Sequence, residues 1–196
     1  MIPETIRSKP TAALTAQTRM TLTFCGEDLY RQFRLREPSL VSCLDQQAPR
    51  RDTDLRILAL YLDSKPAGVA SLIVQRNVQK KTVRNAYGRL DLVIVDRAFR
   101  GLGLGKVLVL AAMVHMLEAF ERRLYSISCL AAHPAIEAIL SQVGFDKRER
   151  KDRGFVHQEL KLDGLEVRGL VNDLVTATSQ AAQVAGFRCR QRGVGR

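Results

Sequence analysis

Three glycines and two flanking bases, within the stretch DRAFRGLGLGKVLVL over residues 96–110, form a pattern that suits an anionic ligand. The glycines alternate with leucines between Arg100 and Lys106. Glycine lets the backbone approach a ligand closely, and the N–H groups and dipole at the start of a helix attract phosphate. A turn that merely needs positive φ is the alternative, but three alternating glycines beside basic residues exceed the needs of one turn. The stretch therefore predicts a phosphate-binding loop at the beginning of a helix.

The glycine spacing argues against two common nucleotide motifs. A Walker loop reads GxxxxGK[ST], whereas only three residues separate Gly101 from Gly105, and Val107 replaces the metal-binding hydroxyl. A dinucleotide fingerprint reads GxGxxG near the start of a βαβ unit, whereas this GxGxG loop follows a predicted hairpin. The pattern excludes a Walker ATPase and gives only weak support to a dinucleotide fold.

A carboxylate in the apolar strand ahead of the loop is a candidate catalytic base. Asp91 lies within YGRLDLVIV, residues 87–95, and the period of two places it on one face with Arg89, Val93 and Val95. A carboxylate can take a proton from an attacking amine. An ion pair with Arg89 or another base near the strand end is the alternative role.

Net charge favours anionic partners. The 196 residues include 31 basic and 20 acidic ones, for a net charge of +11, and 46% are hydrophobic, which suffices for one core. A basic surface attracts nucleotides, nucleic acid and acidic proteins. No RNA-binding motif accompanies the basic C-terminus FRCRQRGVGR, so nucleic acid is an alternative partner rather than the favoured one.

Several function classes lack their sequence signals. The four cysteines form no CxxC pair and the three histidines no HExxH motif, so we expect no disulfide framework and no metal site. The longest apolar run, residues 107–114, is far below the roughly 20 residues of a membrane span. The first residues lack the apolar core of a signal peptide. We therefore expect a soluble cytoplasmic protein with no membrane partner.

Hydrophobic periodicity predicts a mixed α/β sheet, partly antiparallel, built around a strand–loop–helix unit. The predicted strands cover residues 20–24, 56–62, 67–75, 87–95, 125–132 and 155–162. The predicted helices cover residues 28–43, with a break near Pro38, 106–122, and 134–143, which Gly144 ends. We expect a loose lead-in over 1–18, one domain over 19–162, a helix over 163–186 and a disordered basic tail over 187–196.

The C-terminal helix is predicted to be amphipathic, because apolar and small residues recur three or four apart over residues 167–185. Such a stripe docks either on its own domain or on a second copy of the chain. The first reading predicts an added layer on the domain, and the second predicts a homodimer.

Two motifs resemble the GNAT superfamily of N-acetyltransferases over roughly residues 57–162. One is its [RQ]xxGx[GA] signature, matched by Arg100-Gly101-Leu102-Gly103-Leu104-Gly105 after the strand LVIV. The other is HPAIEAILSQVGF, residues 133–145, with the family's helix followed by GF. The resemblance implies a GNAT-like acyl-CoA N-acyltransferase fold with an added C-terminal helix, and acetyl-CoA as cosubstrate.

The resemblance also implies where the cosubstrate binds. The amides from Arg100 to Lys106 would hold its diphosphate, namely those of Arg100, Gly101, Leu102, Gly103, Leu104, Gly105 and Lys106. The pantetheine arm would pair with Val93, Ile94 and Val95, inside a gap whose other wall is residues 128–132. His133 stands where the family often has asparagine, and could cap the helix, contact CoA or donate a proton.

The catalytic pattern of the family is incomplete. Its usual tyrosine, the acid for the leaving thiolate, is replaced by Leu140. The neighbouring Ser141 carries a hydroxyl, but successive residues of a helix point about 100° apart, so Ser141 does not share the direction of Leu140. In the family, a glutamate often stands nearer to the position of Arg89 than to that of Asp91. Asp91 and Ser141 are the catalytic candidates.

Three functions follow. The first is transfer of acetyl from acetyl-CoA to a primary amine, on a small molecule or a protein, by direct attack in a ternary complex. The second, motivated by Leu140, is a non-catalytic acyl-CoA-binding module. The third is a basic protein associated with RNA or the ribosome.

Overall fold

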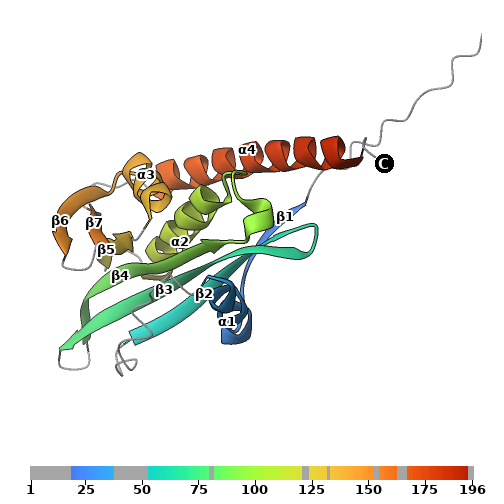
Figure 1. Cartoon of the computed structure of the whole chain (residues 1–196). Coiled ribbons are helices and arrows are strands. Elements are labelled where there is room, and N and C mark those ends of the chain that lie inside the picture. The colour runs from blue at the N-terminus through green and yellow to red at the C-terminus, as the bar shows by residue number, and fades with distance from the viewer. Residues whose placement is uncertain are drawn as a thin grey trace, which may run out of the picture.

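The computed structural model describes residues 19–37, 53–79, 82–120, 124–131, 133–151, 155–162 and 167–193 (Figure 1). Within them, seven strands form one sheet in the order β1-β2-β3-β4-β5-β7-β6. The pairing of β4 with β5 is parallel and every other pairing is antiparallel. The mixed α/β sheet confirms the predicted fold class. The strands are β1 (Met20–Phe24), β2 (Thr53–Leu62), β3 (Lys65–Gln79), β4 (Thr82–Val95), β5 (Leu124–Ala131), β6 (Asp146–Lys151) and β7 (Phe155–Lys161).

Helices cover both sides of the sheet (Figure 1). Helix α1 (Glu27–Arg36) lies on one side, and α2 (Leu104–Phe120) lies on the other side, beneath α4 (Val167–Gly193). Helix α3 (Pro134–Gln142) follows β5, and a single 3-10 turn, η2 (Arg97–Phe99), joins β4 to the glycine loop. The loop therefore lies where the central strand ends and the most buried helix begins.

Helix α2 is buried all round over residues 107–114, because the sheet covers one side of it and α4 covers the other. Every residue from Val107 to Val114 is buried, which explains why its sequence is apolar without a polar face. On α4 the buried residues recur at helical spacing, at Leu170, Ala177, Ala181 and Ala185. The C-terminal helix therefore docks on its own domain, whereas the homodimer stays a prediction.

Several elements differ from those predicted. Helix α4 continues to Gly193, so the predicted disordered tail is helical over residues 187–193. Arginine and glutamine favour helix, and a single glycine such as Gly186 weakens a helix without ending it. Strand β3 reaches Gln79 and β4 begins at Thr82. The polar stretch over residues 77–85, which the sequence left open between a loop and a strand extension, is therefore strand over its described residues. Strand β6, DKRERK, was not predicted, because it has no apolar alternation and lies at the sheet edge, where charged residues are common.

Other expectations fall partly or wholly outside the described residues, namely the lead-in over 1–18 and the continuation of the first helix beyond Pro38. Helix α1 ends at Arg36 with Glu37 as its C-cap, as expected for a residue before proline. In the part of the chain that the structure describes, no helix combines the length and apolarity that crossing a membrane requires.

Candidate functional site

The glycine loop needs glycine at two positions. Gly101 and Gly103 have φ of +74° and +79°, values that residues with a side chain rarely adopt. Lys106 and Val107 then donate their N–H groups to the Gly103 carbonyl, which begins α2. The amides just before them belong to the open N-terminal turn, where no helical carbonyl precedes them. The turn with positive φ, which was the alternative reading of the sequence, is therefore present. Binding of an anion at the start of α2 stays a prediction.

The loop is held by three helices. Leu102 and Leu104 are buried in the core beneath it. A Cβ atom on Gly105 would lie 3.1 Å from Ile139 of α3, and one on Gly103 would lie 3.9 Å from Ala181 of α4. Gly105 therefore allows α2 and α3 to pack closely, while α4 lies beside the bend at Gly103.

Strands β4 and β5 diverge ahead of the loop. Their described pairing runs from Ala86 with Leu124 to Leu90 with Cys129. Strand β4 nevertheless continues to Val95, paired with β3 as far as Gly68. From Asp91 onward, the side of β4 that faces β5 therefore lacks a strand partner among the described pairings, as a gap between the two strands requires.

The backbone direction shows which residues face this gap. Asp96 donates its N–H to the Ala67 carbonyl at 2.9 Å. Because such pairs alternate along an antiparallel ladder, Leu92 and Ile94 also direct their backbone groups toward β3. The N–H and C=O groups of Val93 and Val95 therefore point toward the gap. Ile94, which was predicted with them, pairs with β3 instead.

Asp91 is the extra residue of a β-bulge. Leu90 and Leu92 lie opposite the adjacent residues Leu72 and Ser71, so Asp91 has no counterpart on β3. The bulge reverses the alternation: Leu90 packs in the α2-side core, whereas Leu92 packs in the α1-side core. The prediction that Arg89 shares a face with Val93 and Val95 was therefore wrong, because the extra residue shifts the period.

Ser71 holds the bulge together. Its Oγ accepts the N–H of Leu92 at 3.1 Å and lies 3.4 Å from Oδ2 of Asp91, to which its single proton can be donated. Ser71 is fully buried and Asp91 is 5% exposed. Ser71 was not predicted as a site residue, because its only signal in the sequence is a lone serine in an apolar strand.

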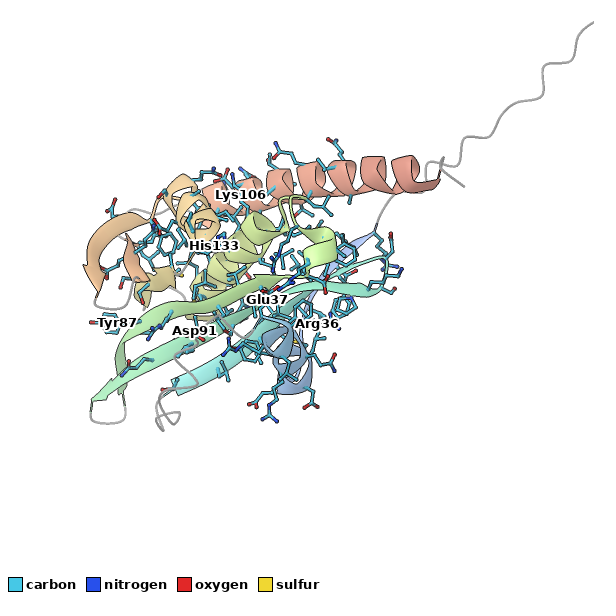
Figure 2. All side chains as sticks on the ribbon, viewed as in Figure 1. Arg36, Glu37, Tyr87, Asp91, Lys106 and His133 are labelled. Carbon is cyan, nitrogen blue, oxygen red and sulfur yellow. The ribbon has the colours of Figure 1, made fainter. Side chains whose placement is uncertain are left out.

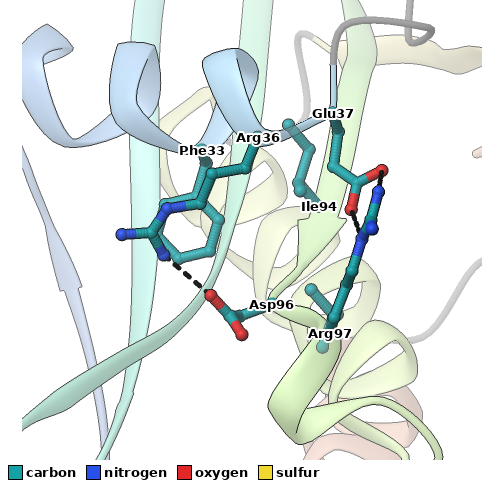
Figure 3. Close-up of a pocket in the computed structure, with 7 residues that line it drawn as sticks. Phe33, Arg36, Glu37, Ile94, Asp96 and Arg97 are labelled. Atoms are coloured by element: carbon teal, nitrogen blue, oxygen red, sulfur yellow. Dashed lines mark hydrogen bonds and ion pairs between the residues drawn. The ribbon is translucent and has the colours of Figure 1, made fainter.

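A pocket of about 310 Å³ lies between the end of α1 and the end of β4 (Figure 3). Two ion pairs cross it: Arg36 to Asp96 at 2.8 Å and Arg97 to Glu37 at 3.0 Å. The hydrogen bond from Arg97 holds the pKa of Glu37 below its ordinary value. The lining also includes Phe33, Ile94 and Val95.

Arg100, the first residue of the glycine motif, reaches into the same region. Its guanidinium donates to the Glu37 carboxylate, and its Nε donates to the Val95 carbonyl at 3.1 Å. Glu37 thus joins α1 to two arginines at the start of the loop. Glu37 was not predicted as a site residue, because its partners Arg97 and Arg100 lie 60 and 63 residues away in the sequence.

The second motif contributes a cap and a buried leucine. His133 Nδ1 accepts the N–H of Ala135 at 3.1 Å and so caps α3. Figure 2 shows His133 and Lys106 on the opposite side of the sheet from Arg36. Leu140 is fully buried, whereas Ser141 is exposed. Ser141 thus lies exposed on α3, whereas Asp91 lies nearly buried on β4.

These features fit an extended ligand that ends in a diphosphate. The loop offers amides at a helix start, and the gap offers backbone groups for an amide-bearing arm. Over the described ranges, no group of three or more His, Cys, Asp or Glu side chains could hold a metal ion.

Comparison with known proteins agrees with this arrangement. The model of the acetyltransferase (GNAT) family matches residues 23–145. No curated protein matches the chain significantly. Similar solved structures include the aminoglycoside acetyltransferase AAC(6')-Ib with coenzyme A, at 14% identity and a TM-score of 0.52, covering 74% of this chain and 96% of that one. An acetyltransferase of the GNAT family from Streptococcus pneumoniae has 13% identity and a TM-score of 0.52, covering 73% and 99%. A mutant AtaT toxin, bound to the C-terminus of the antitoxin AtaR and acetyl-CoA, has 15% identity and a TM-score of 0.50, covering 74% and 95%.

Proposed function

Because the chain belongs to the acetyltransferase (GNAT) family, we propose that it transfers the acetyl group of acetyl-CoA to a primary amine by direct attack in a ternary complex. The observation that carries the proposal is one juxtaposition: the divergence of β4 from β5 leads directly to a loop with two positive-φ glycines at the start of α2. Neighbours that hold acetyl-CoA or coenzyme A support the choice of cosubstrate.

The chain's own groups divide the binding between them. The amides from Arg100 to Lys106 hold the diphosphate, helped by the α2 dipole and the Lys106 ammonium. The gap-facing groups of Val93 and Val95 pair with the pantetheine arm. His133 remains a candidate contact for coenzyme A, since it lies exposed at the head of α3 while its Nδ1 serves the cap.

The acetyl thioester supplies a carbonyl carbon that an amine can attack. Asp91 takes the proton of that amine, held in place by the Ser71 hydroxyl. The N–H of Val93 points into the gap, where it can donate to the oxygen that becomes negatively charged. The proton for the leaving thiolate comes from Ser141 or, because that hydroxyl is exposed on α3, from solvent.

A second candidate is a non-catalytic acyl-CoA-binding module. The fully buried Leu140 favours it, because this side chain fills the core at the position where the family carries its acid. In this case the protein would bind coenzyme A but would not catalyse acetyl transfer.

Calorimetry with coenzyme A, followed by thiol release from acetyl-CoA with a panel of small-molecule and peptide amines, tests both. Binding with turnover that Asp91→Asn lowers by about 10²–10⁴-fold supports the transferase. Binding without turnover across the panel supports the binding module. Absence of binding at modest ionic strength contradicts both.

A further inference from the structure

The Arg100 guanidinium lies across the path that the proposed function assigns to the pantetheine arm. Its Nε donates to the Val95 carbonyl at 3.1 Å. The register points that carbonyl away from β3, toward the gap between β4 and β5. One of the backbone acceptors that the arm would use is therefore already engaged by a side chain of the chain itself.

Glu37 holds Arg100 in this position. The carboxylate accepts from Arg100 and from Arg97, and its side chain is only 13% exposed. Its lowered pKa, caused first by the Arg97 bond, keeps it ionised at neutral pH. Each arginine is far more exposed than the carboxylate between them, at 50% for Arg100 and 74% for Arg97. Glu37 is thus the fixed member of the cluster, and the guanidiniums are the parts with room to move.

The same carboxylate opposes an anionic ligand. It places one negative charge beside the first residue of the diphosphate-binding loop, and it neutralises bases that would otherwise attract phosphate. Neighbouring Arg36 cannot compensate, because Asp96 engages it at 2.8 Å. Asp96 in turn accepts the N–H of Ala98 and so caps η2.

We propose that Glu37 and Arg100 form a latch that lowers the affinity of the chain for coenzyme A. This inference rests on the proposed function, since the ligand is the same. In the latched state Arg100 covers Val95 and is paired with Glu37. Diphosphate binding at the loop attracts Arg100 away from Glu37, which frees the Val95 carbonyl for the pantetheine arm. Glu37 is thereby a residue that sets cosubstrate affinity without contacting the reacting atoms.

The test compares Glu37→Gln with Glu27→Gln by calorimetry with coenzyme A. Glu27 is a matched control, because it pairs with Arg31 on the exposed side of the same helix. Glu37→Gln should bind about three- to tenfold more tightly than the wild type, since one opposing unit charge near the site is worth about 1 kcal/mol in water. The gain should shrink at about 1 M salt, where the Debye length is about 3 Å. Glu27→Gln should bind as the wild type does.

A merely structural Glu37, which only tethers α1, gives the opposite result. Glu37→Gln would then bind coenzyme A equally or more weakly, and either outcome overturns the latch. If the wild type itself binds no coenzyme A, the proposed function fails. Calorimetry on the wild type thus distinguishes failure of the proposed function from failure of the latch.

A measurement on the wild type keeps the inference testable if Glu37→Gln folds poorly. The Arg100 Nε–H resonance, identified by its loss in Arg100→Lys, should shift when coenzyme A saturates the protein. Adenosine 5′-diphosphate, which carries the diphosphate without the pantetheine arm, should shift the same resonance, because the latch opens by attraction of Arg100 to the diphosphate. A resonance that does not move under saturating coenzyme A overturns the latch.

Discussion

Replacement of Gly103 by alanine tests whether the loop conformation itself binds the ligand. Gly103 has φ of +79°, and the nearest atom to an added Cβ would be Ala181 Cβ at 3.9 Å. The new methyl group therefore has space, and the cost comes from the left-handed backbone, at about 1–2 kcal/mol. The loop either keeps its conformation at that cost in stability or relaxes toward negative φ and turns its amides away.

Relaxation should be visible in binding. Loss of one hydrogen bond from a backbone N–H to a charged phosphate costs about 1.5–3 kcal/mol, which weakens the Kd roughly ten- to hundredfold. Calorimetry with coenzyme A and denaturant unfolding should be run on Gly103→Ala and on Gly169→Ala. Gly169 is a matched control, because nothing lies within 4 Å of its added Cβ and its φ is ordinary for a helix. Gly169→Ala should bind normally and gain up to about 1 kcal/mol in stability. If Gly103→Ala kept both its stability and its affinity, the loop would not depend on positive φ.

Three further predictions concern the base, a half-buried histidine and the added helix. Asp91→Asn should lower thiol release by about 10²–10⁴-fold while leaving the Kd for coenzyme A unchanged; a loss of binding instead would make Asp91 structural. Burial, and next the charge of Arg56, lowers the pKa of His115, whose Nε2 accepts from Arg56 at 3.0 Å. The neutral form is thus favoured in the folded state, so unfolding free energy should be full above about pH 6.5 and fall below it; urea unfolding of His115→Gln should lack this decline. Leu170→Ala should cost about 2–5 kcal/mol, whereas Val175→Ala, at a 60% exposed position, should cost little, as thermal unfolding can show.

The sequence was sufficient for features that depend on local patterns. Alternation predicted every described strand except β6. The glycine spacing predicted a loop at this place because positive φ and close approach leave few alternatives to glycine. Pro134 and Gly144 marked the ends of α3 because each acts through its own backbone.

Features that depend on pairing were not readable in this way. Asp91 became a bulge residue only through the register between β3 and β4, and Ser71 became its partner through the same register. Strand β6 is stabilised by its pairing with β7 despite a charged sequence. Glu37 meets Arg97 and Arg100 across some 60 residues. In each case the decisive neighbour is distant in sequence, so no local pattern records it.

The burial of α2 also bears on where the domain ends. The family model ends at residue 145, and the predicted domain ended at 162, yet the outer side of α2 is covered by Leu170, Ala177 and Ala181 of α4. A helix that is apolar all round requires cover on both sides. Removal of α4 would expose this apolar surface and would take Ala181 away from its place beside Gly103. Helix α4 is therefore an integral layer of the domain that carries the loop, rather than an appendage to a complete domain.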